Sequence, residues 1–330
     1  MKKMSKIMLT CLAALTALTV TACGKADNKG KTAQKVDWPK KTVQITVGYA
    51  AGGDSDLYAR TCAKYLTQKL KKDFVVVNTT GAGGLTGAIS VMDSKPDGHT
   101  ILFNHYGCLV QEATGSTSGV SFINDMAQGG SVLVDNSYTL CAKKSLGFKD
   151  WKDLVKYAKA NPDKLTISAN ANSNGYDIVQ QIENAAGIQL KQVEGSGSAS
   201  ARIAAILGGQ HDLIYANYSL LKDYIKNGDL VVMGSIGTKR SSAHPDVPCL
   251  TELIGKPVVS PYIFSFRFPK KTDPKVIAYF DNVMKEICAD PKFVEEIKKL
   301  GGNVVFNDGK SSLETQKKML ADTKARLGGK

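Results

Sequence analysis

Residues 43–60, VQITVGYAAGGDSDLYAR, decide the fold class of this 330-residue chain. The first five residues are rich in β-branched side chains and predict a strand over Val43–Val47. A glycine-rich turn follows, and the sequence then predicts a helix from about Asp54 to Leu70. A strand that passes through a glycine-rich turn directly into a helix is the basic unit of an α/β protein.

The same alternation continues along the chain. A second strand is predicted at 74–77, followed by a glycine-rich turn, a helix to about Ser94 and a third strand at 100–103. A second series predicts helices over 151–160 and 175–186, the latter closed by Gly187, and a further helix to Leu207. Its strands are predicted at 164–168, 189–193 and 213–215, and closing helices at 274–289 and 291–300.

This order predicts two α/β lobes built on parallel sheets, with helices on both faces. The chain is expected to cross back to the first lobe near residues 230–235. The predicted boundaries are 38–140 plus 236–330 for lobe 1 and 141–235 for lobe 2.

Four strand-to-helix turns, two in each predicted lobe, are rich in glycine, serine and asparagine: residues 50–55, 81–86, 170–175 and 195–200. Glycine and asparagine tolerate left-handed backbone and let it approach a ligand closely. The helix behind each turn offers unpaired N–H groups and the positive end of its dipole. Any one turn is also ordinary α/β chemistry, but the set of four predicts a cleft that holds a carboxylate from both sides.

Two motifs would indicate an enzyme, and neither is complete. Gly81-x-Gly83-x-x-x-Gly87 departs from the GxGxxG spacing of dinucleotide sites, and no acidic residue closes the following strand to bind a ribose. The SxxK match that starts at Ser219 has no SDN or KTG element beside it. We therefore expect no catalytic function and no cofactor.

Composition argues against metal and nucleic-acid sites. The four histidines have no partner at ligand spacing, and the lysines are scattered without an aromatic-basic stripe. A basic surface suits anionic ligands, although dispersed lysines also simply keep a protein soluble. Of the seven cysteines, five follow Cys23 in an odd set without CxxC spacing, so at least one is predicted to be free.

Residues 1–22 have the form of a bacterial secretory signal. Lys2, Lys3 and Lys6 precede an apolar run from Ile7 to Val20, and small residues follow it. The Val-Thr-Ala-Cys ending is similar to a lipobox, so Cys23 is predicted to carry the lipid. The alternative is a membrane-spanning helix, but the run is shorter than the roughly 20 residues that a bilayer needs.

The predicted mature chain begins with a polar, flexible tether. Residues 23–37 comprise the lipidated cysteine and a tether rich in Lys, Asn, Gly and Thr, which buries too little to fold. Loss of the three signal lysines lowers the formal net charge from +13 to +10. We expect an extracytoplasmic protein, anchored to the cell membrane by lipid.

Several motifs in order carry a family resemblance. They are WP before VQITVGYAAGGDSDLYAR, VVVNTTGAGGLTGA before KPDGHTILF, then LGGQHDL and TKRSSAHPDVPCLTE. Together, over about residues 38–301, they resemble the substrate-binding proteins of tripartite tricarboxylate transporters. The resemblance implies a Venus flytrap of the periplasmic-binding-protein type, with two α/β lobes joined by crossover strands and the ligand cleft between them.

It also implies a small carboxylate ligand, such as a tricarboxylate, dicarboxylate or amino acid. Delivery would be to a membrane permease of one large and one small subunit, driven by an ion gradient. Carried over by position, the implied ligand-binding residues are Tyr49, Ala51, Gly53, Asp54, Ser55, Asp56, Gly83, Gly84, Thr86, Asn170, Asn172, Ser173, Ser196, Ser198 and Asp212.

The chain departs from the family pattern at several of these positions. Asn170 and Asn172 replace glycines, and asparagine is the next-best residue for left-handed backbone. The family's usual Tyr-Lys-Gly before the fourth loop is absent, which weakens the placement of Ser196 and Ser198. Asp212, in the Gly-Gly-Gln-His-Asp stretch, is a better match and is expected to face the cleft from the second lobe.

Asp54 stands where the family commonly carries Ser or Thr. An ionised carboxylate there would repel a bare carboxylate ligand, so one hypothesis is that Asp54 selects a ligand with a positive group. The alternative is that Asp54 turns outward and caps its helix.

The sequence therefore predicts a lipid-anchored, monomeric receptor that closes its lobes on a small carboxylate. Two alternatives remain: the same clamp as a sensor without a permease, and a lipid-anchored hydrolase. The hydrolase would need a nucleophile–base pair that no motif suggests.

Overall fold

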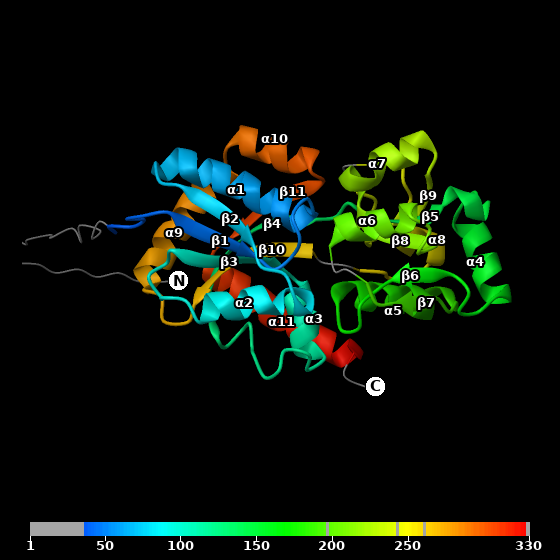
Figure 1. Cartoon of the computed structure of the whole chain (residues 1–330), viewed down its shortest axis with the longest axis horizontal. Coiled ribbons are helices and arrows are strands. Elements are labelled where there is room, and N and C mark those ends of the chain that lie inside the picture. Colours follow the sequence, from blue (N-terminus) through cyan, green and yellow to red (C-terminus); the bar gives the residue numbers. More distant parts are fainter. Residues whose placement is uncertain (1–35, 196–197, 242–243, 260–261, 328–330) are drawn as a thin grey trace, which may run out of the picture. The chain divides into compact units, whose positions relative to one another are not determined.

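Figure 1 shows the fold in a computed structural model, which describes residues 36–195, 198–241, 244–259 and 262–327. The predicted signal peptide, Cys23 and Ser196 lie outside the described residues, as does the predicted tether up to residue 35. No helix within the described ranges is long and apolar enough to cross a bilayer. These ranges all belong to one unit, Val36–Lys330, whose strands form two sheets.

The first sheet has six strands in the order β11-β4-β10-β3-β1-β2. β1 lies parallel to β2 and β3, whereas β10 lies antiparallel to β3 and β4, and β4 lies antiparallel to β11. The bounds are β1 Val43–Val47, β2 Phe74–Asn78, β3 Thr100–His105, β4 Met126–Asp135, β10 Tyr262–Pro269 and β11 Gly302–Asn307.

Helices cover both faces of the first sheet. On β3, Ile101 and Phe103 join a hydrophobic cluster with α1, α9 and α10, whereas Leu102 joins another with α2, α3 and α11. Successive strand residues point to opposite faces, so this apolar run requires a helical layer on each side. Figure 1 shows α1 and α10 on one side and α2 and α11 on the other. The bounds are α1 Asp54–Leu70, α2 Leu85–Met92, α3 Gly107–Ala113, α9 Pro274–Cys288, α10 Pro291–Lys299 and α11 Gly309–Leu327.

The second sheet has five strands in the order β7-β6-β8-β5-β9. β6 is parallel to β7 and β8, and β5 is antiparallel to β8 and β9. The strands are β5 Tyr138–Lys143, β6 Thr166–Ser168, β7 Lys191–Val193, β8 Leu213–Asn217 and β9 Leu230–Ser235. The helices are α4 Trp151–Ala160, α5 Asn174–Ala186, α6 Ala199–Leu207, α7 Tyr218–Asn227 and α8 Leu250–Ile254.

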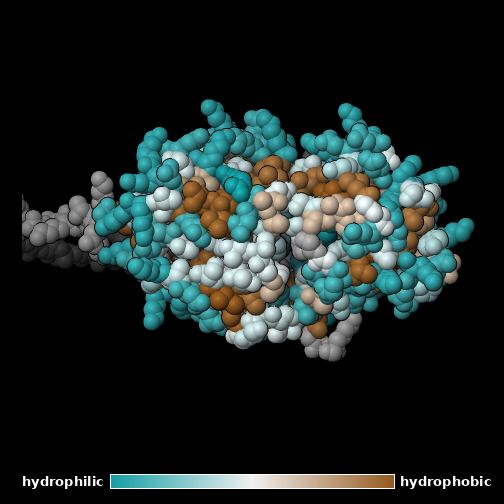
Figure 2. Space-filling view, in the orientation of Figure 1, coloured by the Kyte–Doolittle hydropathy of each residue, from teal (hydrophilic) through white to brown (hydrophobic). Residues whose placement is uncertain are grey.

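The visible surface is mostly polar. Figure 2 shows hydrophilic residues spread over both lobes, with smaller apolar areas between them. On the edge strand β2, Val75 and Val77 are 43% and 38% exposed.

The prediction of two α/β lobes is confirmed, and predicted elements such as α1, α4, α9 and α10 form within a residue or so of their expected bounds. The prediction of parallel sheets is wrong, because β5 and β10 run antiparallel to their neighbours. Each of these strands begins after the chain has crossed from the other lobe. Neither is reached through a strand–helix–strand unit, which is the connection that makes neighbouring strands parallel.

The sheets also divide the chain at other residues than predicted. Residue 140 lies inside β5, so the chain leaves the first sheet after β4 and enters the second at Tyr138. The predicted crossing near 230–235 is instead β9, an edge strand that pairs with β5. α8 packs on β9 as well, and the chain rejoins the first sheet only at β10.

Buried hydrogen bonds fix the crossing between β4 and β5. The Asp135 carboxylate accepts from the Ser137 N–H (2.8 Å) and hydroxyl (2.7 Å), the Tyr58 hydroxyl (2.9 Å) and the Asn217 amide (2.5 Å). The Leu300 carbonyl accepts from the same tyrosine and asparagine, at 3.1 and 2.8 Å. Because Tyr58 belongs to α1 and Asn217 to β8, this hinge network joins the two lobes.

Candidate functional site

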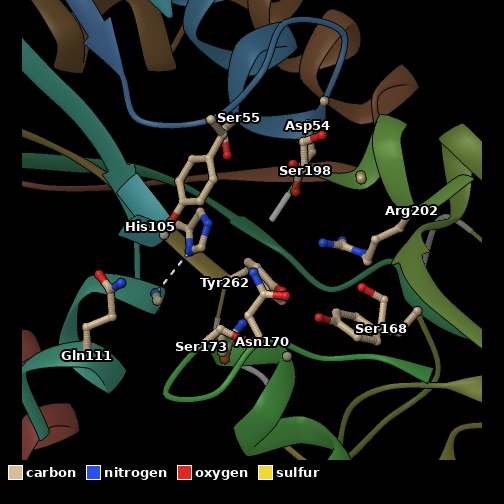
Figure 3. Close-up of a pocket in the computed structure, with 18 of the residues that line it drawn as sticks. Asp54, Ser55, His105, Gln111, Ser168, Asn170, Ser173, Ser198, Arg202 and Tyr262 are labelled. Atoms are coloured by element: carbon tan, nitrogen blue, oxygen red, sulfur yellow. Dashed lines mark hydrogen bonds between the residues drawn. The ribbon is translucent and has the colours of Figure 1, made fainter. Parts of the chain in front are cut away.

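A cavity of about 290 Å³ is lined by residues of both lobes. On the first lobe, the lining comes mainly from the loops that follow β1 and β3; on the second, it includes the N-terminal ends of α5 and α6 (Figure 3). Loops at the carboxyl ends of parallel strands are where α/β proteins bind ligands.

Asp54 places a carboxylate on the first-lobe wall. It is the first residue of α1 and follows Gly53, which occupies the N-cap position. Its side chain is 8% exposed and accepts a hydrogen bond from the Tyr138 hydroxyl. The alternative that Asp54 turns outward to cap the helix is therefore wrong, and the carboxylate lines the cavity (Figure 3).

Arg202 places a cation on the second-lobe wall. It lies one turn into α6, whose N-cap Ser198 accepts from the Ala201 N–H at 3.2 Å. The side chain is 7% exposed, and its guanidinium lies 4.6 Å from the ring centroid of Tyr215. Figure 3 shows it reaching into the cavity from the second lobe. A guanidinium in this position can bind a carboxylate through two parallel hydrogen bonds.

Aromatic rings form another part of the cavity wall. Tyr49 stacks on His105 with ring centroids 4.8 Å apart, and Tyr262 lies 5.0 Å from the same imidazole. Burial lowers the pKa of His105 to about 4, with nearby arginine charges lowering it and Asp54 raising it. The imidazole is thus neutral at pH 7. Its Nδ1 accepts from the Gly107 N–H at 3.0 Å, which leaves Nε2 as the protonated donor (Figure 3).

The N-terminus of α5 supplies further donors from the second lobe. Its N-cap Ser173 accepts from the Tyr176 N–H at 3.1 Å. Gly175 allows a close approach, because a Cβ there would meet the Tyr215 hydroxyl at 1.5 Å. Two helix N-termini therefore converge with Arg202 on one side of the cavity, an arrangement that favours an anionic group.

Gln111 lies on the first-lobe side of the cavity, near residues Ala82–Gly84. Its amide nitrogen donates to the Ala82 carbonyl at 2.8 Å, which identifies the other amide atom as Oε1. This oxygen is buried and has no hydrogen-bond partner among the described residues. Buried acceptors are normally paired, so a ligand donor would satisfy it.

The structure brings eight of the predicted site residues together around the cavity: Tyr49, Gly53, Asp54, Ser55, Gly83, Asn170, Ser173 and Ser198. Six others do not line it: Ala51, Asp56, Gly84, Thr86, Asn172 and Asp212. Ser196 is outside the described residues.

Asp56 and Asp212 have structural partners instead. Asp56 pairs with Arg60 at 2.9 Å and accepts from the Gly52 N–H at 3.0 Å. Asp212, predicted to face the cleft, lies immediately before β8 and pairs with Lys143 at 3.1 Å. Its side chain lies at the end of the strand remote from the cavity, which explains its absence from the lining.

Of the two asparagines predicted to bind the ligand, Asn170 lines the cavity and Asn172 does not. Asn172 has the left-handed backbone that its replacement of glycine implied, with φ 61°, but lies outside the lining. Asn170 lines the cavity, and its Oδ1 accepts from the Gly195 N–H at 2.8 Å, which ties two of the predicted loops together.

Sequence reasoning missed Arg202, His105, Gln111, Tyr138 and Tyr262. A signal existed for Arg202, a lone charge in the segment SASARIAAIL directly after a predicted ligand loop. His105 ends a predicted strand that the structure extends by two residues. Tyr138 and Tyr262 begin β5 and β10, strands that the sequence analysis did not identify.

Within the described ranges, no group of His, Cys, Asp and Glu side chains could hold a metal ion. The five cysteines in these ranges are buried and free. The prediction of at least one free cysteine is confirmed.

Residues 58–329 match the sequence model of the tripartite tricarboxylate transporter family receptor. The chain belongs to this family. The membership in the tripartite tricarboxylate transporter receptors that the sequence motifs predicted is therefore confirmed.

Individual proteins agree with this assignment. The "UPF0065 protein in gbd 5'region" of Cupriavidus necator is 28% identical over 272 residues, which are 81% of this chain and 80% of the relative. The structure of the periplasmic binding protein BugD is 26% identical with a TM-score of 0.81, over 88% of this chain and 98% of BugD. MatC of Rhodopseudomonas palustris, solved with bound malate, has a TM-score of 0.78 at 19% identity, over 87% and 99%. Its likeness supports the periplasmic-binding-protein fold.

Proposed function

We propose that this receptor is an extracytoplasmic solute-binding protein that captures a small carboxylate in the cavity between its lobes. The observation that carries the proposal is the convergence of Arg202 with the N-termini of α5 and α6 on one wall. A buried guanidinium and two positive dipole ends are placed to bind an anion. The malate bound in MatC supports the same ligand class.

The captured solute would be delivered to a membrane permease of one large and one small subunit. Opening and closing of the lobes would leave the hinge network intact as a pivot, because its hydrogen bonds join the lobes at the crossing from β4 to β5. Cys23 would carry the lipid that holds the receptor at the membrane. We propose no catalytic step for this site and expect the receptor to act as a monomer.

The test is thermal unfolding of the full-length protein with citrate, C4-dicarboxylates, amino acids and aromatic acids. A ligand at about 100 times its Kd adds about 2.7 kcal/mol, or roughly 5 °C for a protein of this size. A shift with one ligand class, lost in Arg202→Gln, supports the proposal. Failure of all four classes to shift the midpoint contradicts it.

Delivery needs a separate experiment. Cells that express the permease would take up the radiolabelled ligand with the receptor present, and a Cys23→Ala variant would be released from the membrane fraction. Uptake that does not depend on the receptor would contradict the transport role and favour a sensor.

A further inference from the structure

The cavity holds two buried charges of opposite sign, one from each lobe. Asp54 is 8% exposed and Arg202 is 7% exposed, and both line the cavity (Figure 3). Each buried charge is costly to remove from water unless an opposite charge compensates it. A ligand that fills the cavity must therefore suit both.

The lining as a whole does not favour a bare polyanion. Its carboxylates are Asp54 and Glu194, and Arg202 is the cation that faces them among the described lining residues. The imidazole of His105 adds no charge at pH 7, because burial keeps it neutral. A ligand with two or three carboxylates would place at least one of them near Asp54, where like charges repel.

Two groups on the first-lobe side, the carboxylate of Asp54 and the amide oxygen of Gln111, call for hydrogen-bond donors, although His105 offers a donor on the same side. An ionised carboxylate such as that of Asp54 only accepts hydrogen bonds. The buried Oε1 of Gln111 has no donor within the described part of the chain. A dicarboxylate at neutral pH carries no N–H group to satisfy these acceptors, whereas an ammonium carries three donors.

We propose that the ligand is a zwitterion of amino-acid type, with its carboxylate at Arg202 and its ammonium at Asp54. The inference rests on the proposed solute-binding function and narrows the substrate class of that site. Binding would neutralise one buried charge on each lobe, so the ligand itself would bridge them in the closed state. A cavity of about 290 Å³ is roughly twice the ~150 Å³ that accommodates benzene, which is sufficient for an amino acid.

The test uses pairs of ligands that differ only at the α-nitrogen. The full-length protein is titrated calorimetrically with L-alanine, L-leucine, L-phenylalanine and L-aspartate, and with L-lactate, L-2-hydroxyisocaproate, L-phenyllactate and L-malate. We expect any amino acid that binds to do so at least tenfold more tightly than its hydroxy acid.

Asp54→Asn removes the charge and keeps the shape and an acceptor for the Tyr138 hydroxyl. This variant should reduce the preference for the amino acid to less than threefold. Asp56→Asn is the matched control: it changes a carboxylate in the same helical turn that pairs with Arg60 and does not line the cavity. It should retain the wild-type preference.

Three results overturn the inference. If hydroxy acids bind as tightly as amino acids, or Asp54→Asn keeps the wild-type preference, the ligand is not held as a zwitterion but the carboxylate-binding function stands. If none of the eight compounds binds and citrate and aromatic acids also fail, the proposed function fails with it. Should Asp54→Asn not fold, the wild-type ratio alone decides between these outcomes.

Discussion

Two buried carboxylates, Asp135 in the hinge network and Asp54 in the cavity, have different surroundings. Asp135 is 1% exposed and receives four hydrogen bonds from donors in both lobes. Asp54 is 8% exposed, and within the described residues the Tyr138 hydroxyl is the side-chain donor that reaches it.

The difference indicates which buried carboxyl group serves the fold and which serves the ligand. A fully satisfied polar network holds a single geometry, whereas a partly satisfied one is costly unless a further partner arrives. Asp135 thus fixes the relation of β4, α1 and β8, whereas Asp54 lines the cavity, where a ligand can supply a further donor.

The largest expected effect is on ligand affinity, through Arg202 in the cavity. Arg202→Gln should weaken binding of the carboxylate ligand by about 4 kcal/mol, close to a thousandfold in Kd, because it removes a buried charge-assisted contact. Calorimetric titration measures the change. Arg202→Lys should lose less affinity than Arg202→Gln. The control is Arg60→Gln, which changes a half-exposed arginine outside the cavity and should keep the wild-type affinity. Equal affinities of wild type and Arg202→Gln would show that Arg202 does not bind the ligand.

The next largest effect is on the stability of the protein, through Asp135 in the hinge network. Asp135→Ala should lower the free energy of unfolding by about 3 kcal/mol, because it leaves buried donors of Ser137 and Asn217 without their acceptor. Urea unfolding measures this loss. The exposed Asp73→Ala should change stability by less than about 0.5 kcal/mol. An unchanged unfolding midpoint for Asp135→Ala would show that the hinge network adds no stability.

The contrast between these regions explains what the sequence could predict. Local patterns identified α1, its glycine-rich turn and Asp54, because strand, turn and helix are adjacent in the chain. Tyr138 and Tyr262 reach the cavity only because β5 and β10 enter their sheets after long crossings. Periodicity carries no information about such non-local pairing, so Tyr138, Tyr262 and the whole hinge network were missed.

The cavity charges illustrate the same limit. Position relative to a loop placed Asp54 in the site, but whether it faced inward depended on the tertiary contact with Tyr138. Asp212 also lies in a motif that suggested the cleft, yet β8 runs toward the cavity from that residue, so its side chain lies at the far end of the strand.

A smaller effect should follow from pH. Burial raises the pKa of Asp135 from 3.8 to about 7, with the Asp54 charge adding to the rise and the Ser137 and Tyr58 donors opposing it. The native state therefore holds this proton more tightly than the unfolded state. Its contribution to stability is fully present below about pH 4 and is lost as pH rises toward 7.

Comparison with Asp135→Asn isolates this contribution, since His105 titrates in both proteins and cancels. From pH 4.5 to 8, the stability of wild type relative to the variant should fall by at least about 1.4 kcal/mol, the equivalent of one pKa unit. Unfolding titrations at both pH values measure the change. A constant difference would mean that the Asp135 carboxyl titrates near its unfolded value.

The smallest expected effect concerns a third carboxylate, Asp212, whose pKa is shifted in the direction opposite to that of Asp135. Asp212 is half-buried and accepts hydrogen bonds from the Thr166 N–H and hydroxyl, at 2.9 and 2.8 Å, besides its ion pair with Lys143. Burial raises its pKa, but the Thr166 donors and the lysine outweigh this and lower it. Its contribution is therefore lost as pH falls below the unfolded value of 3.8, opposite in sign to that of Asp135.

Asp212→Asn should consequently cost about 1 kcal/mol of stability at pH 7, because a partly exposed pair with hydrogen bonds is worth little more than that. It should leave the Kd of the ligand unchanged, since the side chain does not line the cavity. Calorimetric titration of Asp212→Asn beside Asp54→Asn makes the distinction. A tenfold loss of affinity in Asp212→Asn would mean that the carboxylate reaches the ligand in a closed state, and the sequence-based placement of Asp212 in the cleft would then be the correct one.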